Sequence, residues 1–364
     1  MAGAGVYTYQ LVRALAQAGS RHELVVFARP GLFDDLAQEQ QLQVAHVEPS
    51  SRARRLIWEQ TELPLLLRRL RIDVLHSPHH HTPIAAKLPL GARPKLVVTV
   101  HDLTFMLLPE RYPLARRLYM QSATRASALV ADAIITPSQT VRREVIQRLG
   151  LPAERVVSIP EAASPLYREA SRTEIEEVRA RYGLPQRYVL SVGSLEPGKN
   201  RARLFRALAS MHDRGIDCSL AVAGQPAWSY QQDYDLVRQL GLTGQVLFLG
   251  YVADQHMPAL YSGAALLAFP SLYEGFGLPV LEAMACGTPV VTSNVSATAE
   301  VAGDAAVLVD PLSTKAIALA IETLLCDDAL RSNLRQRGLA RAAQFSWERA
   351  ALETLLLYEL VAAQ

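Results

Sequence analysis

The sequence predicts an α/β protein made of two doubly wound parallel-sheet domains with a cleft between them. Short apolar strands alternate with helix-length connections in both halves of the chain, a spacing typical of parallel sheets. This alternation is interrupted at residues 159–167, where two prolines precede a charged helix over residues 173–182. We therefore expect two Rossmann-like domains, at residues 1–164 and 165–345, followed by a terminal helical segment at residues 346–364.

The expected strands can be placed in order along the chain. The front half has candidate strands at residues 24–28, 74–76, 96–100 and 133–136. The back half has candidates at residues 188–192, 219–223, 246–249, 264–269, 289–292 and 306–309. Residues 347–360 are apolar at helical spacing and predict the last helix.

Composition narrows the class of protein. The chain has 364 residues, of which 50% are hydrophobic and 20% charged, so it is long and apolar enough for two cores. Its three cysteines are widely separated, which indicates neither a disulfide framework nor a zinc site and fits a reducing cytoplasm. No apolar run approaches the roughly 18 residues of a membrane span, and the first residues lack a secretion signal. We expect a cytoplasmic protein, soluble or peripheral to the membrane.

The charge is distributed unevenly. Residues 1–164 contain 20 Lys and Arg against 14 Asp and Glu, a net charge of +6, which leaves −4 for the rest of a chain whose total is +2. Arginines at positions 52, 54, 55, 68, 69 and 71 flank apolar residues in the basic half. Such a segment either contacts an anionic membrane or acceptor, or is an ordinary helix with a solvated arginine face. No nucleic-acid-binding module accompanies the charge, so we expect no nucleic-acid partner.

The most informative stretch is residues 269–289, which leads from an apolar strand through a loop into a short helix. Pro279 fits the first turn of this helix, and Gly287 is placed to end it. Gly275 and Gly277 leave the backbone at the helix N-terminus open to an anion. The stretch therefore predicts a phosphate-binding site, with Glu274 just before the helix and Glu282 within it.

Two charged or titratable residues follow other predicted strands. Lys199 lies in a glycine-containing loop after the strand at residues 188–192, where a lysine can bind a diphosphate or simply be solvated. His101 follows the strand at residues 96–100, a position more common for a packed histidine than for a catalytic one. Ligands of doubly wound sheets bind at the carboxyl ends of the strands, so both residues are candidates for a site.

The segment Glu274-Gly-Phe-Gly-Leu-Pro-Val-Leu-Glu282 resembles the signature of the family 4 retaining glycosyltransferases. The resemblance continues, in the family's order, at residues 99–105, 191–200, 248–251 and 300–304, and it covers nearly the whole chain. It implies the GT-B fold, in which the C-terminal half binds a nucleotide sugar, the N-terminal half binds the acceptor and the last helix crosses back to the first domain.

The resemblance also implies roles for individual residues. Glu282 would accept hydrogen bonds from the ribose hydroxyls, Glu274 would approach the donor sugar, and Lys199 would bind the diphosphate. His101 would line the transferred sugar, contributing its imidazole or its backbone carbonyl. The remaining donor-binding residues would be Gly275, Phe276, Gly277, Leu278 and Gly5. The family requires neither a metal ion nor a cofactor, since the nucleoside-diphosphate sugar is a substrate.

The sequence departs from the family at two points. Relatives often have an arginine where this chain has Gly198, and Arg201 is a possible substitute for the lost phosphate contact. Gly5 belongs to a glycine loop that normally follows a first β-strand, so the chain is expected to begin about one strand late. His79, His80 and His81 follow another predicted strand, where an acceptor-site role is more plausible than a metal site.

We therefore expect a retaining transferase that moves a hexose, mannose or glucose, from a GDP- or UDP-sugar to a glycan or lipid-linked acceptor. The overall pattern is similar to that of bacterial enzymes of surface polysaccharide assembly. Two alternatives are a catalytically impaired binding partner of the same fold and a nucleotide-sugar epimerase. A double-displacement glycosidase is disfavoured, because it needs carboxylates about 5 Å apart across one bond.

Overall fold

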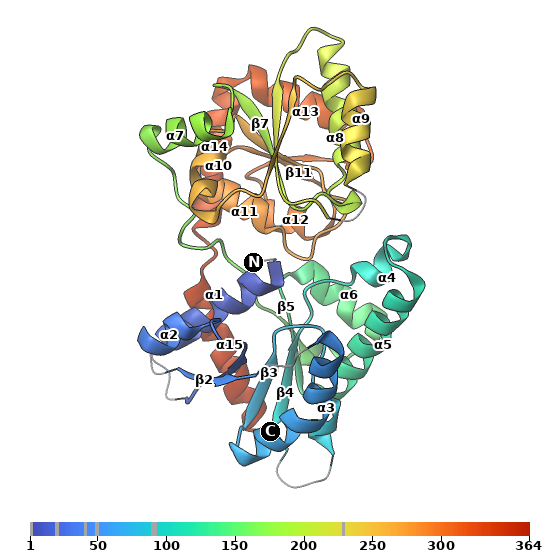
Figure 1. The fold of residues 1–364 in the computed structure, drawn as a ribbon, viewed down its shortest axis with the longest axis vertical. Helices are drawn as coiled ribbons and strands as arrows, with labels where there is room; N and C mark the ends of the chain where they lie inside the picture. Colours follow the sequence, from blue (N-terminus) through green and yellow to red (C-terminus); the bar gives the residue numbers. More distant parts are fainter. Residues whose placement is uncertain (1–2, 19–21, 40–41, 48–50, 89–92, 228–229) are drawn as a thin grey trace. The chain divides into compact units, whose positions relative to one another are not determined.

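The computed structural model describes the chain except residues 1–2, 19–21, 40–41, 48–50, 89–92 and 228–229. The chain folds as two compact units (Figure 1). Unit 1 comprises Met1–Glu161 and Ser346–Gln364, and unit 2 comprises Ala162–Phe345. The boundaries expected from the sequence, 164/165 and 345/346, lie close to these divisions.

Unit 2 is built on a six-stranded parallel sheet with the order β12-β11-β10-β7-β8-β9. Its strands are β7 (Tyr188–Val192), β8 (Ser219–Ala223), β9 (Val246–Gly250), β10 (Leu266–Phe269), β11 (Val290–Ser293) and β12 (Val307–Val309). From β7 the chain builds outward to β9, then returns to add β10 on the other side of β7. The strand order reverses between β7 and β10, and ligands bind doubly wound sheets at such a switch point.

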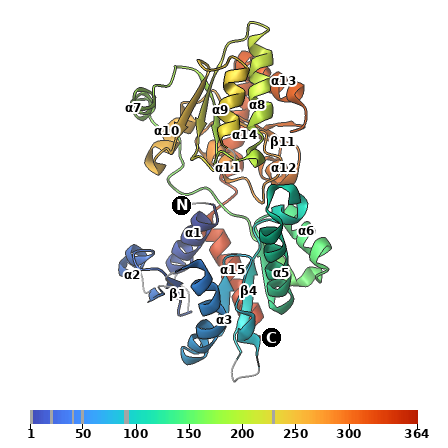
Figure 2. The same ribbon diagram turned by 45° about the vertical axis from the view of Figure 1, so that its right-hand side comes forward.

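Helices cover both faces of this sheet (Figures 1 and 2). One core is formed with α8 (Arg201–His212), α9 (Gln231–Gln239) and α13 (Thr314–Cys326). The core on the other face involves α7 (Arg172–Tyr182), α10 (Met257–Ser262), α11 (Leu278–Ala285) and α12 (Ser296–Ala302), and α14 (Asp328–Ala342) packs against α11. Two 3₁₀ turns complete the unit, η4 (Pro197–Lys199) and η5 (Asp254–His256). The central strands β7, β10 and β11 are almost fully buried, which explains their near-continuous apolar sequences.

Unit 1 contains a four-stranded parallel sheet, β3-β4-β5-β6, and a separate parallel pair, β1-β2. The strands are β1 (Val25–Ala28), β2 (Gln43–His46), β3 (Val74–Ser77), β4 (Lys95–Thr99), β5 (Ala133–Thr136) and β6 (Val156–Ser158). Strands β2 and β6 were not predicted from the sequence. Both are short, and neither is fully buried, so neither carries an uninterrupted apolar run.

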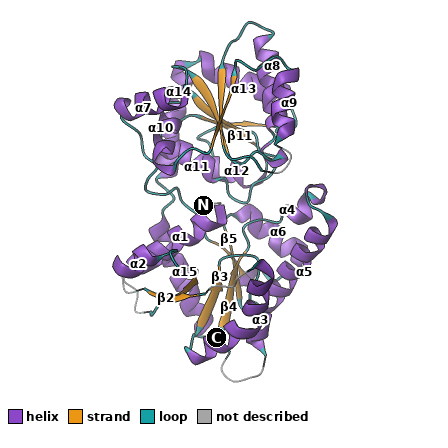
Figure 3. Ribbon diagram, in the orientation of Figure 1, coloured by secondary structure: helices purple, strands orange, loops and turns teal. Residues whose placement is uncertain are grey.

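The helices of unit 1 come from both ends of the chain. They are α1 (Gly3–Gln17), α2 (Asp34–Glu39), α3 (Arg52–Arg69), α4 (Thr104–Leu107), α5 (Leu114–Val130), α6 (Gln139–Leu149) and α15 (Trp347–Ala362), with 3₁₀ turns η1 (Ile84–Lys87), η2 (Pro109–Arg111) and η3 (Ala153–Arg155). The last helix, α15, packs along α1 and also contacts β3 and β4 (Figures 1 to 3). None of the helices in the described part of the chain has the length and apolar character needed to cross a bilayer.

Candidate active site

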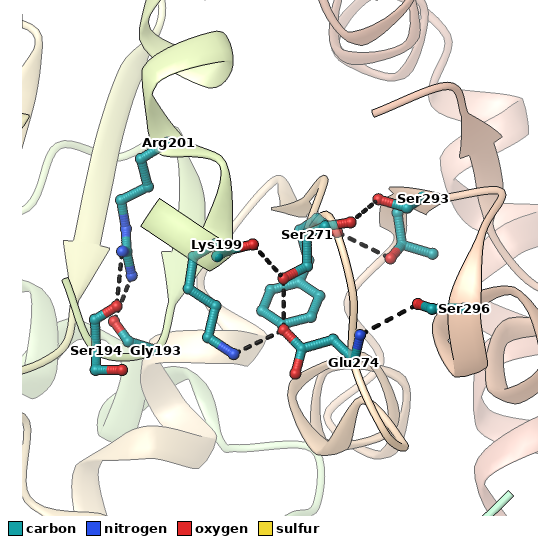
Figure 4. Close-up of polar contacts among 11 residues, drawn as sticks. Gly193, Ser194, Lys199, Arg201, Ser271, Glu274, Ser293 and Ser296 are labelled. Atoms are coloured by element: carbon teal, nitrogen blue, oxygen red, sulfur yellow. Dashed lines mark hydrogen bonds and ion pairs between the residues drawn. The ribbon is translucent and has the colours of Figure 1, made fainter. Parts of the chain in front are cut away.

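Two loops meet at the switch point of the unit 2 sheet. Lys199 ends the short turn η4 after β7, and Glu274 lies in the loop after β10. Because β7 and β10 are hydrogen-bonded neighbours, their carboxyl ends bring these loops together. The Lys199 ammonium nitrogen lies 2.6 Å from Oε1 of Glu274, and both side chains are largely buried (Figure 4). A lysine and a carboxylate 75 positions apart in the sequence thus form one charged pair.

Serine hydroxyls hold the Glu274 loop in place (Figure 4). The Ser271 hydroxyl lies within hydrogen-bonding distance of Glu274 Oε1 and 3.1 Å from the carbonyl oxygen of Gly198. The Ser293 hydroxyl donates to the Ser271 carbonyl at 2.6 Å, and the backbone N–H of Glu274 donates to the Ser296 hydroxyl at 3.3 Å. The carboxylate is therefore oriented by Lys199 and Ser271, and its loop is held by Ser293 and Ser296, which restricts its position before any ligand binds.

The Lys199 loop is fixed by backbone contacts. Asn200 has a left-handed conformation, and its side-chain amide donates to the carbonyls of Pro270 and Pro311 at 2.8 and 2.7 Å. Gly224 lies so close to Gly193 that a Cβ at position 224 would be 1.9 Å from the Gly193 carbonyl oxygen. Only glycine allows this approach, which lets the ends of β7 and β8 lie together beneath the lysine.

Arg201 does not replace the phosphate contact absent at Gly198. Its side chain is fully buried, and its guanidinium donates to the carbonyls of Gly193 and Ser194. These hydrogen bonds support the turn that carries Lys199. Burial lowers the pKa of Arg201, but the group is an arginine and stays charged at neutral pH. The suggestion made from sequence is therefore wrong, and Arg201 is a structural residue of this loop.

Helix α11 begins beside Glu274. Its N-cap residue, Gly277, has a φ of 106°, in the region that favours glycine, and Pro279 lies in the first turn. Phe276 is buried with its ring 5.9 Å from that of Phe345, and Leu278 packs against the same core. These two apolar side chains anchor the helix, so any contact they make to a donor would be through their backbone groups.

Glu282 lies further along α11 and is paired with tyrosines. The Tyr261 hydroxyl donates to its Oε2 at 2.8 Å. Burial raises the pKa of Glu282 to about 7, against the opposing effects of hydrogen bonds from Tyr261 and Tyr167. Sequence reasoning found neither tyrosine, because their relation to Glu282 arises only when α10 and the segment before α7 pack on α11. Glu274 and Glu282 thus have different partners, Lys199 and the two tyrosines respectively.

His101 and Gly5 both belong to unit 1. His101 follows β4, and its Nε2 donates to the carbonyl of Pro78 at 2.9 Å, while its Nδ1 lies 3.4 Å from a carboxylate oxygen of Glu161. Burial lowers the pKa of His101, but the hydrogen bond and charge of Glu161 outweigh burial and leave the pKa above its usual value. Both ring nitrogens are engaged, so a hydrogen bond from the imidazole to a sugar would have to replace one of these contacts. Gly5 lies in the first turns of α1.

The three consecutive histidines extend this cluster. The rings of His79 and His80 lie 6.1 and 6.2 Å from that of His101. Burial lowers the pKa of His80 to about 4, so its imidazole is neutral at physiological pH. Within the described residues, no group of three or more His, Cys, Asp or Glu side chains is arranged to hold a metal ion. A neutral imidazole is suited to hydrogen bonds with hydroxyl groups.

Comparison with known proteins places the chain in a family. Residues 1–164 match the family model for Glycosyltransferase Family 4, and residues 174–341 match that for Glycosyl transferases group 1. The O-antigen chain mannosyltransferase B of Escherichia coli is 34% identical over 379 residues, which cover 99% of this chain and 97% of that protein. The serotype-specific mannosyltransferase WbdA of Escherichia coli is 33% identical over 282 residues, 75% of this chain but only 34% of WbdA.

Solved structures show the same fold. The Anabaena protein HepE, crystallised with UDP and glucose, superposes with a TM-score of 0.77 at 22% sequence identity, over 98% of this chain and 96% of HepE. This likeness confirms the predicted GT-B class, with parallel sheets in two α/β domains. The family models and the full-length relative carry the assignment further: the chain belongs to the glycosyltransferase family defined by the group 1 and family 4 models.

Proposed function

We propose that this glycosyltransferase moves a hexose, with mannose favoured, from a nucleoside-diphosphate sugar to a glycan or lipid-linked acceptor, with retention of configuration and without a metal ion. The observation that carries the proposal is the Lys199–Glu274 pair, which lies at the switch point of the unit 2 sheet and directly before α11. A cation and a helix N-terminus at this position suit a diphosphate, and an adjacent carboxylate suits a sugar hydroxyl.

The donor diphosphate would be stabilised as it leaves. When the bond between the sugar's anomeric carbon and the diphosphate oxygen breaks, negative charge develops on the departing diphosphate. Lys199 and the positive end of the α11 helix dipole would stabilise this charge, and preorganised groups of this kind act most strongly on the transition state. These groups take the role that a divalent cation has in other transferases, which is the basis for proposing metal independence.

The other residues would orient the two substrates. Glu282 would accept hydrogen bonds from the ribose hydroxyls at carboxylate lone pairs that the Tyr261 and Tyr167 hydroxyls do not use. On donor binding the Lys199–Glu274 pair would separate, so that Lys199 binds the diphosphate and Glu274 contacts the donor sugar. The acceptor hydroxyl would attack the anomeric carbon from the face the diphosphate leaves, passing its proton to the departing oxygen, which gives retention. The carbonyl of His101 would face the positive charge that develops on the sugar.

Mannose is favoured by the relatives. Both Escherichia coli proteins are named mannosyltransferases, and the one aligned over 97% of its length is named for O-antigen chains. HepE was solved with UDP, so the choice between GDP and UDP is left to experiment. We propose a cytoplasmic enzyme of surface polysaccharide assembly, with the nucleotide sugar as substrate and no cofactor.

A lipid-linked acceptor is supported by the surface of α3. Ile57 and Leu65 on this helix are each 62% exposed, and Arg54 and Arg69 are exposed alongside them. Exposed apolar side chains between arginines are typical of segments that rest on an anionic bilayer. The side chain of Arg52, which also belongs to the basic cluster seen in the sequence, lies outside the described residues. We therefore propose peripheral association with the inner face of the membrane.

Product analysis tests the function directly. The protein is incubated with GDP-mannose, UDP-glucose or GDP-glucose, with and without a mannose-terminated acceptor, and products are separated by mass. We expect an acceptor larger by one hexose with a mannosyl donor, and NMR of the product should show the anomeric configuration of the donor. Epimerised nucleotide sugar formed without acceptor would support an epimerase instead, and donor binding without turnover would support an impaired binding protein.

A further inference from the structure

His101 is linked to both places where the chain passes between the units, by a direct contact on one side and through the ring of Tyr7 on the other. Glu161 is the last residue of unit 1 before the chain enters unit 2, and Trp347 follows the return to unit 1 at Ser346. Although they are far apart in the sequence, both lie in the surroundings of His101. None of the motifs in the sequence indicated a function for either residue.

The first contact is polar and buried. Glu161 is only 5% exposed, and Oε1 of its carboxylate lies 3.4 Å from Nδ1 of His101. A buried carboxylate is costly unless it is paired, and the imidazole provides the pairing. On the opposite side of the ring, Nε2 donates to the Pro78 carbonyl. With both nitrogens fixed, the ring of His101 has one orientation, and its backbone is held with it.

The second contact runs through aromatic rings. The ring of Tyr7 stands edge-on to that of His101, with centroids 4.7 Å apart and an interplanar angle of 83°. The ring of Trp347 lies 5.9 Å from that of Tyr7, and the Tyr7 hydroxyl is 3.1 Å from the hydroxyl of Thr99. Trp347 is 3% exposed, and its indole N–H has no hydrogen-bond partner among the described residues. Trp347 is therefore held by packing, and its ring sets the position of Tyr7.

We propose that Glu161 and Trp347 are positioning residues that tie the two chain crossings to His101 and so set the orientation of the His101 peptide during sugar transfer. The proposal rests on the assignment of His101 under the proposed function. It gives the buried Glu161 carboxylate a role that packing alone does not require, because an apolar residue of similar size would fill its place without the cost of burying a charge.

The pKa of His101 can be used to detect its pairing with Glu161. Besides Glu161, the titratable groups around His101 among the described residues include Asp102, Tyr7, His76, His79 and His80. Asp102 raises the pKa of His101 in the same direction as Glu161 but less strongly. Removing the Glu161 charge should therefore lower the pKa of His101 without abolishing its titration.

The central experiment compares Glu161→Gln with Glu359→Gln. Glu359 pairs with His22 at 2.9 Å on the exposed surface of unit 1, so its variant loses a histidine–glutamate contact away from His101. We expect Glu161→Gln to lower the NMR-measured pKa of His101, assigned with a His101→Gln variant. We also expect kcat to fall by about tenfold with donor KM changed by less than about twofold, the pattern of a misoriented catalytic group. Glu359→Gln should change neither quantity.

Trp347→Phe tests the contact between the rings of Trp347 and Tyr7, because the variant keeps an apolar ring and loses no hydrogen bond seen in the described structure. Its control is Phe33→Leu, which removes a buried ring stacked on Tyr9 elsewhere in unit 1. Both substitutions shrink a buried aromatic side chain and should lower thermal stability to a similar extent. We expect Trp347→Phe to lower kcat severalfold and Phe33→Leu to leave kcat unchanged.

Two results would overturn the proposal. One is an unchanged pKa of His101 in Glu161→Gln, and the other is a loss of activity in either variant no larger than in its control. The titration needs no turnover, so it tests the pairing even if the unaltered protein transfers no sugar. If the proposed function is wrong, the unaltered protein will transfer no sugar. If only this proposal is wrong, the unaltered protein will be active and Glu161→Gln and Trp347→Phe will be as active as their controls.

Discussion

The ammonium of Lys199 lies 2.6 Å from the carboxylate of Glu274, so in the free protein the lysine that would bind a diphosphate is already paired with the carboxylate that would contact the sugar. A diphosphate must compete with Glu274 for this ammonium. Binding of the donor would separate the pair and release the carboxylate toward the sugar. The affinity for nucleotide and the rate of transfer should therefore respond differently to changes at these two residues.

Replacing Glu274 with glutamine should affect binding and turnover in opposite directions. Without the carboxylate charge, Lys199 is free for the diphosphate, and GDP or UDP should bind about threefold more tightly, the scale of a modest ion pair. Turnover should fall at least tenfold, because the sugar loses its charged partner. Isothermal titration calorimetry and steady-state rates measure the two effects. Weaker nucleotide binding in a folded variant would contradict the competition.

Replacing Lys199 with alanine should weaken nucleotide binding by roughly 1.5–3 kcal/mol, the scale of a hydrogen bond to a charged group. The matched control is Lys315→Ala, since Lys315 is an exposed lysine on α13 of the same unit. Calorimetry with GDP and UDP makes the measurement. Equal affinities for Lys199→Ala and the unaltered protein would remove Lys199 from the diphosphate site.

Glu282→Ala should selectively weaken the binding of nucleotides that have both ribose hydroxyls. The unaltered protein should bind the ribonucleotide more tightly than its 2′-deoxy analogue, because the deoxy sugar lacks one donor to the carboxylate. In Glu282→Ala this preference should largely disappear. Calorimetric titration of each protein with the ribonucleotide and with its 2′-deoxy analogue measures this preference. If the preference is unchanged in Glu282→Ala, the ribose does not bind to Glu282.

Glu282 also predicts a pH dependence of stability. Its pKa rises from 4.5 to about 7 on folding, mainly by burial, so folding favours the protonated form. The resulting stabilisation is complete below pH 4.5 and is lost as the pH rises through 7. Glu282→Gln, which cannot ionise, should therefore gain in Tm relative to the unaltered protein between pH 5 and pH 8.

A control with the opposite shift accompanies that measurement. Hydrogen bonds from Arg168 and Ser171 lower the pKa of Glu174 to about 2, so its contribution is present above pH 4.5 and lost only as the pH falls toward 2. The Tm difference between Glu174→Gln and the unaltered protein should stay constant from pH 5 to pH 8. A constant difference for Glu282→Gln as well would show that Glu282 is ionised throughout.

The basic surface of α3 should bind anionic vesicles. Each basic residue near such a membrane contributes about 1 kcal/mol, an attraction that salt screens. We expect co-sedimentation with phosphatidylglycerol vesicles at low ionic strength, weakened by salt and by Arg54→Gln/Arg69→Gln. The control, Arg335→Gln/Arg337→Gln, changes two arginines of α14 in unit 2. Absence of binding at low salt, or equal binding by both variants, would favour a soluble acceptor.

The sequence by itself determined the local structure and the chemical type of the site. Near-continuous apolar runs identified β5, β7 and β8 to the residue, because strands buried on both faces carry few polar positions. The glycines and prolines around residues 269–289 located a two-turn helix, which the structure has as Leu278–Ala285. The run from Glu274 to Glu282 was sufficient to indicate the family. These features depend on residues near one another in the chain.

Only the tertiary structure decided which side chains are partners. Lys199 meets Glu274 because β7 and β10 are neighbours in the sheet, an order that strand sequences do not encode locally. Arg201 is one of several arginines in the sequence, and its burial against the carbonyls of Gly193 and Ser194 follows from the close approach of two loops. Glu161 reaches His101 across 60 positions in the same way. Hydrogen bonds and ion pairs act over about 3–4 Å, so the pairing of distant residues is fixed only when strand order and loop packing bring them within that range.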